Sequence, residues 1–245
     1  MTHTRSNETL ARRYHNVLKE SGIEAIYSSP SDLSGVFLAS LPADFDQADF
    51  RVIVVGQEPK SWHSKCSIQS GGAATLESVE ASMKAHQDYF ADVEEHEALF
   101  LRFLADGQAK VQTALPDRSV SFVWANLLCV SDSRKSPVKS AHFARIQAIS
   151  GDLLKALIAE VDPHAILFTT GPRYDKYLHA IFSEWSAGHA EEPHRLAKFR
   201  FGEAVCLRTC HPRYVKDNVW RAKALQIITE HAGTPTCAGS AAGNG

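Results

Sequence analysis

Short apolar runs recur along the chain, and each ends in a small or polar residue. Residues 51–56, with the sequence R-V-I-V-V-G, are apolar on both faces and rich in β-branched side chains. This pattern is typical of a strand that a parallel sheet buries on both sides. Runs of the same kind predict three further strands, at residues 120–124, 165–169 and 204–208.

Between these runs, apolar residues recur at helical spacing. Asn7 is a suitable cap for a first helix, which Gly22 should end. Similar spacing predicts a long helix over 76–106, stopped by Gly107, and further helices over 141–160, 173–183 and 217–231. Polar stretches that contain Gly, Pro or Ser are expected to form loops, at residues 28–49, 60–75 and 131–139.

The alternation of strands and helices predicts an α/β fold. We expect a three-layer α/β/α sandwich with a central, mostly parallel four-stranded sheet, formed by a single domain over residues 1–232. Its crossovers should be right-handed. The small and polar residues 233–245 are expected to form a disordered tail.

The composition is that of a globular protein. Of 245 residues, 44% are hydrophobic and 22% are charged, and the formal net charge is -2. These values exclude a mainly disordered or coiled-coil chain, and a protein that coats itself in nucleic acid through its overall charge. No apolar stretch approaches the ~18 residues of a membrane helix, and the first residues lack the apolar core of a signal peptide. We therefore expect a cytoplasmic protein with no membrane partner.

Five cysteines are scattered along the chain with no Cys-x-x-Cys spacing. In a cytoplasmic protein they are expected to be reduced thiols. Cys206 and Cys210 could pair or bind a metal, but a zinc site needs two more ligands at suitable spacing. Buried strand thiols are the favoured interpretation, and no metal site is expected.

Polar residues follow each predicted strand. Ligands of open parallel α/β sheets bind at the carboxyl ends of the strands. This rule brings four segments to one edge of the sheet: residues 56–59 (G-Q-E-P), Asn126, residues 169–171 (T-T-G) and residues 210–212 (C-H-P). The first of these segments has a single glycine, so it is neither a P-loop nor a dinucleotide-binding fingerprint.

Each polar side chain at this edge has a chemical and a structural interpretation. Glu58 is suited to act as a general base or to stabilise a cation, or else it caps a helix or loop. Gln57 holds a ligand or ties down its loop. The amide of Asn126 offers the donors and the acceptor that read a pyrimidine edge, or it serves a turn. A neutral His211 is suited to donate a hydrogen bond to a developing oxyanion, or it is a capping or surface histidine.

Charge is distributed unevenly along the chain. Residues 193–223 hold eight basic and two acidic side chains, whereas residues 77–106 hold eight acidic and two basic ones. The basic segment surrounds His211, where a phosphate backbone would run past the strand ends. Solvated helix faces are the alternative explanation, and for the acidic segment they are the favoured one.

Three short blocks, in this order, resemble the uracil-DNA glycosylase superfamily. Residues 54–59 (V-V-G-Q-E-P) are similar to the family's G-Q-D-P-Y-H block. Residues 123–127 (V-W-A-N-L) are similar to the strand that ends in the uracil-reading Asn, and residues 211–213 (H-P-R) to the H-P-S block. Residues 169–171 also resemble the end of the family's third strand. The order and strand context of these blocks cover roughly residues 50–230.

The resemblance implies a DNA glycosylase, which flips a uracil or another deaminated base out of the duplex and hydrolyses its N-glycosidic bond. Glu58 would steady the cationic sugar and orient water, and His211 would stabilise the departing base anion. Asn126 would read the base. The resemblance further implies base-pocket residues Gly56, Gln57 and Pro59, and DNA-binding residues Arg213, Tyr214 and Lys216. Water is the nucleophile in this chemistry, so we expect no cofactor. The expected partner is DNA with a damaged base, and the protein is expected to be a monomer.

The chain departs from the family pattern at several positions. Its first-block carboxylate is one methylene longer than the family's Asp. Lys60 stands where a thymine-excluding Tyr is usual, and it would lower the pKa of the neighbouring carboxylate or block the pocket. Arg213 replaces a small Ser. Gly71 falls where a base-stacking Phe is usual, so Trp62 or His63 would stack instead.

Two other classes of function stay open. Lys60 and Arg213 motivate a catalytically inactive protein of the same fold that binds nucleic acid or a nucleobase. Such a protein would bind in a salt-dependent way and release no base from any lesion. Cys206 and Cys210 motivate a thiol-dependent redox or metal protein, which bound metal or sensitivity to alkylation would reveal.

Overall fold

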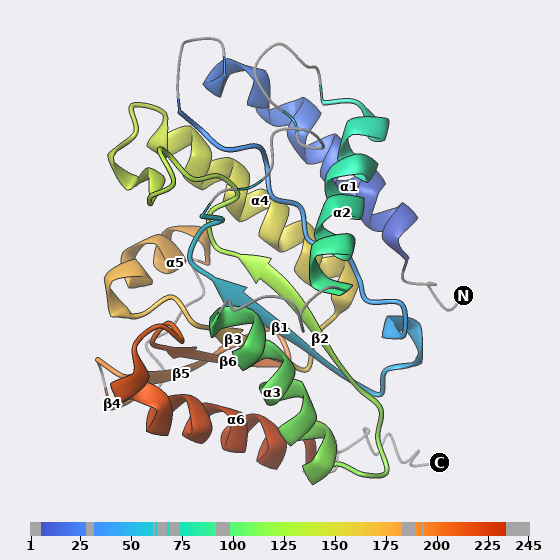
Figure 1. Cartoon of the computed structure of the whole chain (residues 1–245), viewed down its shortest axis with the longest axis vertical. Coiled ribbons are helices and arrows are strands. Elements are labelled where there is room, and N and C mark those ends of the chain that lie inside the picture. The colour runs from blue at the N-terminus through green and yellow to red at the C-terminus, as the bar shows by residue number, and fades with distance from the viewer. Residues whose placement is uncertain are drawn as a thin grey trace, which may run out of the picture.

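The centre of the molecule is one mixed β-sheet (Figure 1). The structure is a computed structural model that describes residues 6–27, 32–60, 62, 68, 74–91, 99–182, 190–192 and 194–233. Within these residues the sheet has six strands, in the order β2-β1-β3-β6-β5-β4. The strands are β1 (Phe50–Gly56), β2 (Val120–Asn126), β3 (Ala165–Phe168), β4 (Ala190–Glu192), β5 (Leu196–Phe201) and β6 (Ala204–Thr209).

The four predicted strands are β1, β2, β3 and β6, and they pair in parallel, so the expectation of a mostly parallel sheet is confirmed. The expected number of four strands is wrong, because β5 pairs antiparallel with β6 and β4 pairs antiparallel with β5. Apolar side chains of β5 are buried, whereas its Lys198 and Arg200 are exposed. A strand with one exposed face has this alternation. The β5 strand was not predicted, because Lys198 and Arg200 were interpreted as part of the basic segment 193–223.

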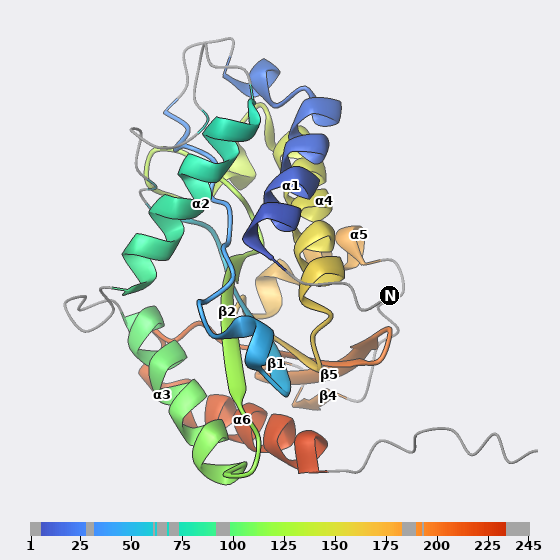
Figure 2. The ribbon, with the colours of Figure 1, turned by 90° about the vertical axis from the view of Figure 1, so that its right-hand side faces the viewer.

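Helices cover both faces of the sheet, as Figure 2 shows from the side. The helices of the described residues are α1 (Asn7–Ser21), α2 (Leu76–Ala91), α3 (Leu99–Ala114), α4 (Phe143–Val161), α5 (Asp175–Ile181) and α6 (Asn218–Gly233). On one face α1 packs against α2 and α4, and on the other α3 packs against α6. The architecture is therefore α/β, compatible with a three-layer sandwich. Within the described part of the chain, no helix has the length and apolar character that crossing a membrane requires.

The helix predicted over 76–106 is wrong in two respects. It is divided into α2 and α3, and the residues between them lie outside the described part of the chain. Gly107 does not stop α3, which continues to Ala114. A Cβ atom at Gly107 would lie 3.4 Å from Phe122 and 3.5 Å from Leu225. This glycine therefore allows α3 to pack closely against β2 and α6, and it does not end the helix.

The first helix begins and ends close to its predicted residues. Ser6 is its N-cap instead of Asn7, because the Ser6 hydroxyl accepts a hydrogen bond from the backbone N–H of Thr9 at 3.1 Å. Gly22 ends the helix in the left-handed conformation, with φ of 60°. At the other end of the chain, Gly233 is the last residue of α6, and the predicted tail beyond it lies outside the described residues.

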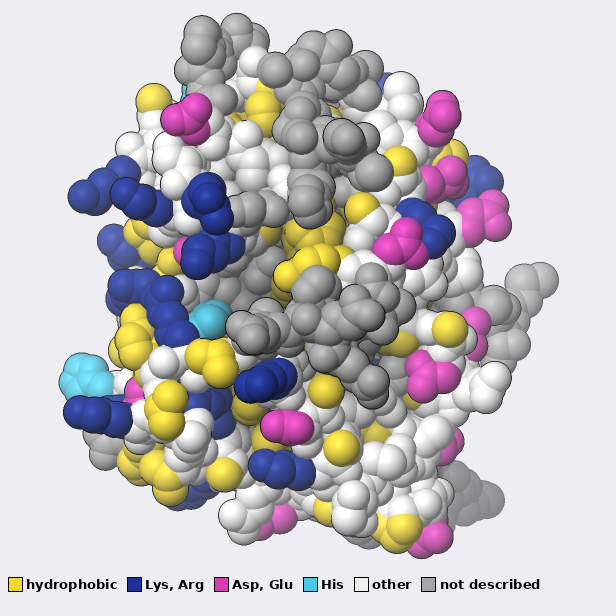
Figure 3. Space-filling model, viewed as in Figure 1, with side chains coloured by type: hydrophobic (Ala, Val, Ile, Leu, Met, Phe, Trp, Pro, Cys, Tyr) yellow, Lys and Arg dark blue, Asp and Glu magenta, His cyan; other side chains and the backbone are white. Residues whose placement is uncertain are grey.

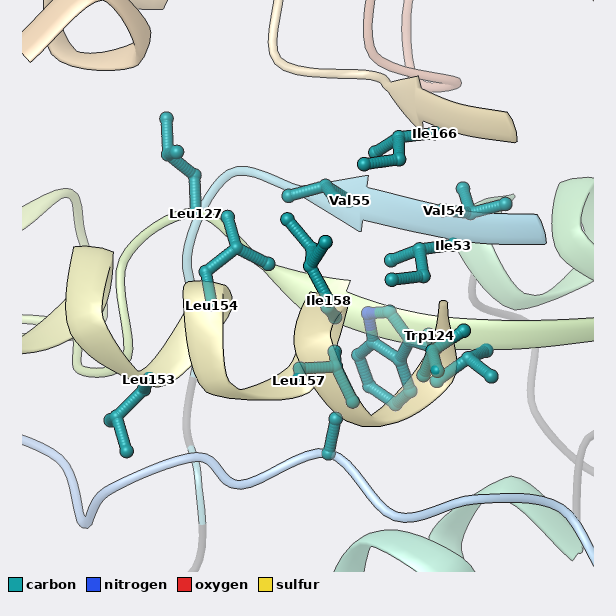
Figure 4. Close-up of a cluster of buried hydrophobic side chains, with 14 of the residues drawn as sticks. Ile53, Val54, Val55, Trp124, Leu127, Leu153, Leu154, Leu157, Ile158 and Ile166 are labelled. Carbon is teal, nitrogen blue, oxygen red and sulfur yellow. The ribbon is translucent and has the colours of Figure 1, made fainter. Parts of the chain in front are cut away.

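The sheet and α4 share an apolar core, shown in Figure 4. Ile53, Val54 and Val55 of β1 are fully buried, and Leu154 and Leu157 of α4 are almost so. Replacing such a buried leucine by alanine typically costs ~2–5 kcal/mol. This core holds the parallel strands in register, and it thereby fixes the positions of the residues that follow their carboxyl ends.

Candidate functional site

The strand ends meet at one edge of the sheet, as the topology rule predicted. Gly56 at the end of β1 lies in register with Asn126 at the end of β2. The backbone N–H of Leu128 donates to the carbonyl of Gln57 at 3.0 Å, which joins the two following loops. Gly171, after β3, donates through its N–H to the carbonyl of Thr209 at the end of β6, also at 3.0 Å. The structure therefore brings the predicted segments together.

Gly56 and Asn126 are packed so closely that only glycine fits at position 56. A Cβ atom there would overlap Asn126 Oδ1 and lie 3.3 Å from Cε2 of Phe100. The Asn126 side-chain nitrogen Nδ2 is buried, and it has no hydrogen-bond partner among the described residues. An unsatisfied buried donor is costly, so this amide is suited to bind a group that enters the site.

Phe100 is a site residue that the sequence reasoning missed. Its ring, from the first turn of α3, lies 5.9 Å from the His211 imidazole with planes only 30° apart. The proposed stacking residue Trp62 instead packs in an aromatic cluster, with its ring 4.8 Å from Phe37 and 6.3 Å from Trp124. His63 and Gly71, also named in that argument, lie outside the described residues. Only the position of α3 in the fold brings Phe100 here.

Glu58 is half-buried, and neutral side chains hold it. The Tyr174 hydroxyl donates to Glu58 Oε2 at 2.6 Å, and the same hydroxyl lies 3.1 Å from Ser136 Oγ. Burial raises the pKa of Glu58, and the Tyr174 hydrogen bond and the charges of Arg173 and Arg213 counteract this effect. The Tyr174 hydroxyl therefore anchors one oxygen of a carboxyl group whose pKa burial raises.

Tyr174 is itself held in place by a buried ion pair. It precedes Asp175, and the Arg208 guanidinium contacts both carboxylate oxygens of that residue, at 2.9 and 3.0 Å. Arg208 is 1% exposed. This ion pair, with its hydrogen bond from Arg208 Nη2 to Asp175 Oδ2, joins the beginning of α5 to β6 and so helps to position the Tyr174 ring. The sequence reasoning had counted Arg208 among the cations that face DNA.

His211 is half-buried and neutral near pH 7. Burial lowers the pKa of His211 to about 4, and the nearby charges of Arg213, Arg221 and Arg173 act in the same direction. The backbone N–H of Arg213 donates to His211 Nδ1 at 3.2 Å. Nδ1 is therefore an acceptor and the ring proton lies on Nε2. A neutral imidazole in this tautomer is an N–H donor for a negatively charged oxygen or nitrogen.

Gln57 ties the site together through both ends of its amide. Its Nε2 donates to the Thr170 carbonyl at 2.7 Å, and its Oε1 accepts from Arg213 Nη2 at 3.4 Å. The same guanidinium nitrogen donates to the Tyr214 hydroxyl at 3.1 Å. Of the two interpretations of Gln57, the geometry favours the structural one.

The remaining predicted residues lie at the rim of the site. Pro59 is buried, whereas Lys60 is exposed. The cations that act on the Glu58 carboxylate are Arg173 and Arg213, so the expected role of Lys60 in neutralising it passes to these arginines. Tyr214 is 44% exposed, and Lys216 is also exposed.

The basic segment 193–223 does not form one continuous cationic surface. Arg208 and Arg221 are buried, and Arg195 is paired with Asp217. Arg221 donates to the carbonyls of His211 and Tyr214, at 3.2 and 3.1 Å. The prediction that a phosphate backbone runs past His211 therefore depends on the exposed cations of this segment, and Arg221 holds the loop after β6 in shape.

A cavity of about 340 Å³ opens beside Gln57, between the loop after β3 and the loop after β6. Arg173, Arg195 and Tyr214 are among the residues that line it. A second cavity, of about 420 Å³, lies at the opposite edge of the sheet and is lined in part by Arg13 and Glu160. The first cavity borders the predicted site, and the second does not contain any of its residues.

The cysteines contribute no site within the described residues. Cys206 lies in β6 and is fully buried, Cys210 follows this strand, and both are free thiols. Burial raises the pKa of the Cys206 thiol to about 12, so this thiol is unreactive at neutral pH. No three His, Cys, Asp or Glu residues of the described ranges come together as metal ligands would. The geometry favours the interpretation of buried strand thiols.

A scan against protein-family models finds no match, and neither does a search of curated proteins.

Proposed function

We propose that the chain is a DNA glycosylase related to the uracil-DNA glycosylase superfamily, which hydrolyses the N-glycosidic bond of uracil or another deaminated base flipped out of DNA. One observation carries the proposal. Three strand ends at one edge of the sheet carry a half-buried carboxylate, a neutral imidazole N–H and an unpartnered buried amide, in Glu58, His211 and Asn126. These are the groups that a developing sugar cation, a departing base anion and a pyrimidine edge each require.

The mechanism follows from the charges that appear as the bond breaks. The electron pair of the bond between the sugar C1′ and the base nitrogen leaves with the base. His211 Nε2–H stabilises the resulting base anion by a hydrogen bond, and the Glu58 carboxylate stabilises the cationic sugar. Water then forms the new bond to C1′ and loses its proton through Glu58 to solvent or to the base. Every reactant is water or DNA, so the proposed reaction requires no cofactor. The proposal also includes a monomer in the cytoplasm.

One observation favours a second function, that of a protein which binds nucleic acid or a nucleobase without cleaving it. Phe100 lies against both Gly56 and His211, so its ring narrows the space between the strand ends. A flipped base would either stack on this ring or be kept out by it. In the second case the basic side chains at the rim would still bind phosphates.

An oligonucleotide assay tests both functions. Labelled oligonucleotides, single- and double-stranded, would carry one uracil, hypoxanthine or xanthine, and alkali would cut the strand at each abasic site. We expect wild type and the control variant His15→Ala, altered in α1, to produce cleavage on at least one lesion. The His211→Ala variant should bind the same DNA and produce almost none. Absence of cleavage on every substrate would overturn the enzyme proposal and leave the binding function.

A further inference from the structure

A surface outside the predicted DNA-binding loop is rich in cations. Residues 133–151 contain four basic and no acidic side chains. All four are exposed, as are two further cations at the beginning of α5 and just before it; the six are Arg134, Lys135, Lys139, Arg145, Arg173 and Lys176. Figure 3 shows Lys and Arg gathered on the side of this face that holds α5, whereas Asp and Glu gather mainly toward α2.

Two of these cations lie on or beside a strained turn. Asp132 and Lys135 pair through two backbone hydrogen bonds, of 2.8 and 2.9 Å, which leaves Ser133 and Arg134 as the two turn residues. Their φ values are 49° and 62°, in the left-handed region where such hairpins usually carry Asn-Gly. Strain of this kind persists only where the surrounding structure imposes it, and it is concentrated at functional sites.

Asp32 supplies that support. The Ser133 backbone N–H donates to the Asp32 carbonyl at 3.0 Å, and the Ser133 hydroxyl lies 3.0 Å from Asp132 Oδ1 and 3.2 Å from Asp32 Oδ2. The turn is therefore held in one shape, and it presents the exposed side chains of Arg134 and Lys135 from a fixed backbone. Glycine is the residue that adopts this backbone conformation most readily, and the chain has an arginine there instead.

The same segment connects directly to the candidate site. Ser136 follows Lys135, and its Oγ lies 3.1 Å from the Tyr174 hydroxyl that holds Glu58. Arg173, which precedes Tyr174, acts on the Glu58 carboxylate through its charge. A chain of phosphates that leaves the site on this side would therefore meet Arg173 and then the strained turn.

We propose that this surface, the turn at 133–134 with the exposed cations Lys135, Lys139, Arg145, Arg173 and Lys176, is a second binding surface for the DNA phosphate backbone. Most of it lies outside the loop that follows His211, and Arg173, which lines the same cavity as Tyr214 of that loop, lies where the two meet. Its role in substrate binding rests on the proposed function, but phosphate binding here does not require that the protein release a base. The recognition is electrostatic, so it is sensitive to salt and indifferent to base sequence.

The test measures how DNA affinity depends on salt. Fluorescence anisotropy with a labelled duplex containing one uracil would give the Kd over a series of NaCl concentrations, for wild type and for Arg134→Gly/Lys135→Gln. Glycine adopts the observed φ without strain, so the turn should keep its shape in this variant, and a thermal melt of the variant would check that it folds. The matched control, Lys19→Gln/Lys110→Gln, removes the same charge from exposed positions on α1 and α3.

We expect the slope of the logarithm of the association constant, 1/Kd, against the logarithm of the NaCl concentration to become less steep by about 0.9 for each phosphate that the variant no longer neutralises. The control should keep the wild-type slope. A slope equal to that of the control would overturn the proposed surface, as would a wild type that binds no DNA.

The glycosylase proposal and the surface proposal fail separately. A wild type that binds DNA but releases no base contradicts the glycosylase proposal alone, and a cleaving enzyme whose slope is unchanged in the variant contradicts the surface alone.

Discussion

Two buried or half-buried glutamates lie at opposite edges of the same sheet, and they are held in different ways. Glu160, near the end of α4, is 1% exposed and forms an ion pair with Arg13 at 2.9 Å. It also accepts a hydrogen bond from the backbone N–H of Ser6 at 3.2 Å. Glu58, after β1, is held by the neutral hydroxyl of Tyr174 at 2.6 Å.

The difference distinguishes a structural carboxylate from one available for chemistry. Both oxygens of Glu160 have partners, and a cation neutralises it at direct contact. One oxygen of Glu58 is anchored, and cations act on it only through space. Burial alone is therefore no guide to function at these two positions, whereas the kind of partner is.

Replacing each of the two glutamates by glutamine tests this distinction most directly and should produce the largest effect. Glu58→Gln should reduce base release by a factor of about 10³ or more, because the neutral amide cannot stabilise a cationic sugar. Its DNA affinity should stay within about twofold of wild type. Glu160→Gln should release base at the wild-type rate per folded molecule. Single-turnover rates with a uracil-containing duplex would check both, and equal losses in the two variants would contradict the distinction.

Tyr174→Phe should produce a smaller loss, of about tenfold in the rate of base release, because it removes the hydrogen bond that orients Glu58. The direction of the change in the rate–pH profile depends on which form of Glu58 the hydrogen bond stabilises. The hydrogen bond stabilises the ionised carboxylate, so its loss raises the Glu58 pKa. Activity that needs this ionised form should then begin to fall at a higher pH than in wild type.

A rate–pH profile would check this prediction, with Tyr177→Phe as the matched control. The Tyr177 ring packs edge-on against Tyr174 at 5.8 Å, so its variant removes a neighbouring hydroxyl and leaves the Glu58 contact in place. Overlapping profiles for Tyr174→Phe and the control would show that the hydroxyl has no positioning role.

The free energy of unfolding should fall more in Glu160→Gln than in Glu58→Gln, which is the reverse of their expected effects on base release. Glu160→Gln removes the charge that pairs with Arg13, and we expect a loss of about 1–2 kcal/mol in the free energy of unfolding, since Arg13 is 41% exposed and partly solvated. Glu58→Gln should change this free energy by less than about 1 kcal/mol. Urea denaturation of the two variants would measure both values, and a larger loss in Glu58→Gln would mean that this carboxylate is mainly structural.

The smallest expected effect concerns His211, whose imidazole should not change its protonation state near neutral pH. With a pKa of about 4, His211 should remain neutral from pH 6 to pH 8. Its imidazole NMR signals should then be constant over this range, whereas those of an ordinary exposed histidine shift with a midpoint near 6.5. A midpoint of His211 above pH 6 would contradict the neutral donor on which the proposed mechanism depends.

Much of the fold follows from local pattern, and the errors have local causes too. The four parallel strands could be predicted because each is an uninterrupted apolar run. The β5 strand was missed because its exposed Lys198 and Arg200 were counted as a charge cluster. Gly107 was misread as a helix stop, since sequence does not show that Phe122 and Leu225 crowd the position.

The candidate site divides in the same way. Glu58, Asn126 and His211 could be predicted because the carboxyl ends of parallel strands must meet at one edge, whatever the details of packing. The positions of Tyr174, Ser136 and Phe100 around them depend on how separate segments dock, and no spacing along the chain indicates it.

By itself, therefore, the sequence determined which apolar runs form the parallel strands, the class of the fold and the edge of the sheet at which polar groups converge. These features depend on periodicity and on the direction of the chain. Only the tertiary structure decided which carboxylate is paired, which arginine is buried and which aromatic ring faces His211. Those outcomes are set by contacts between residues far apart in the chain, such as Arg208 with Asp175 and Tyr174 with Glu58.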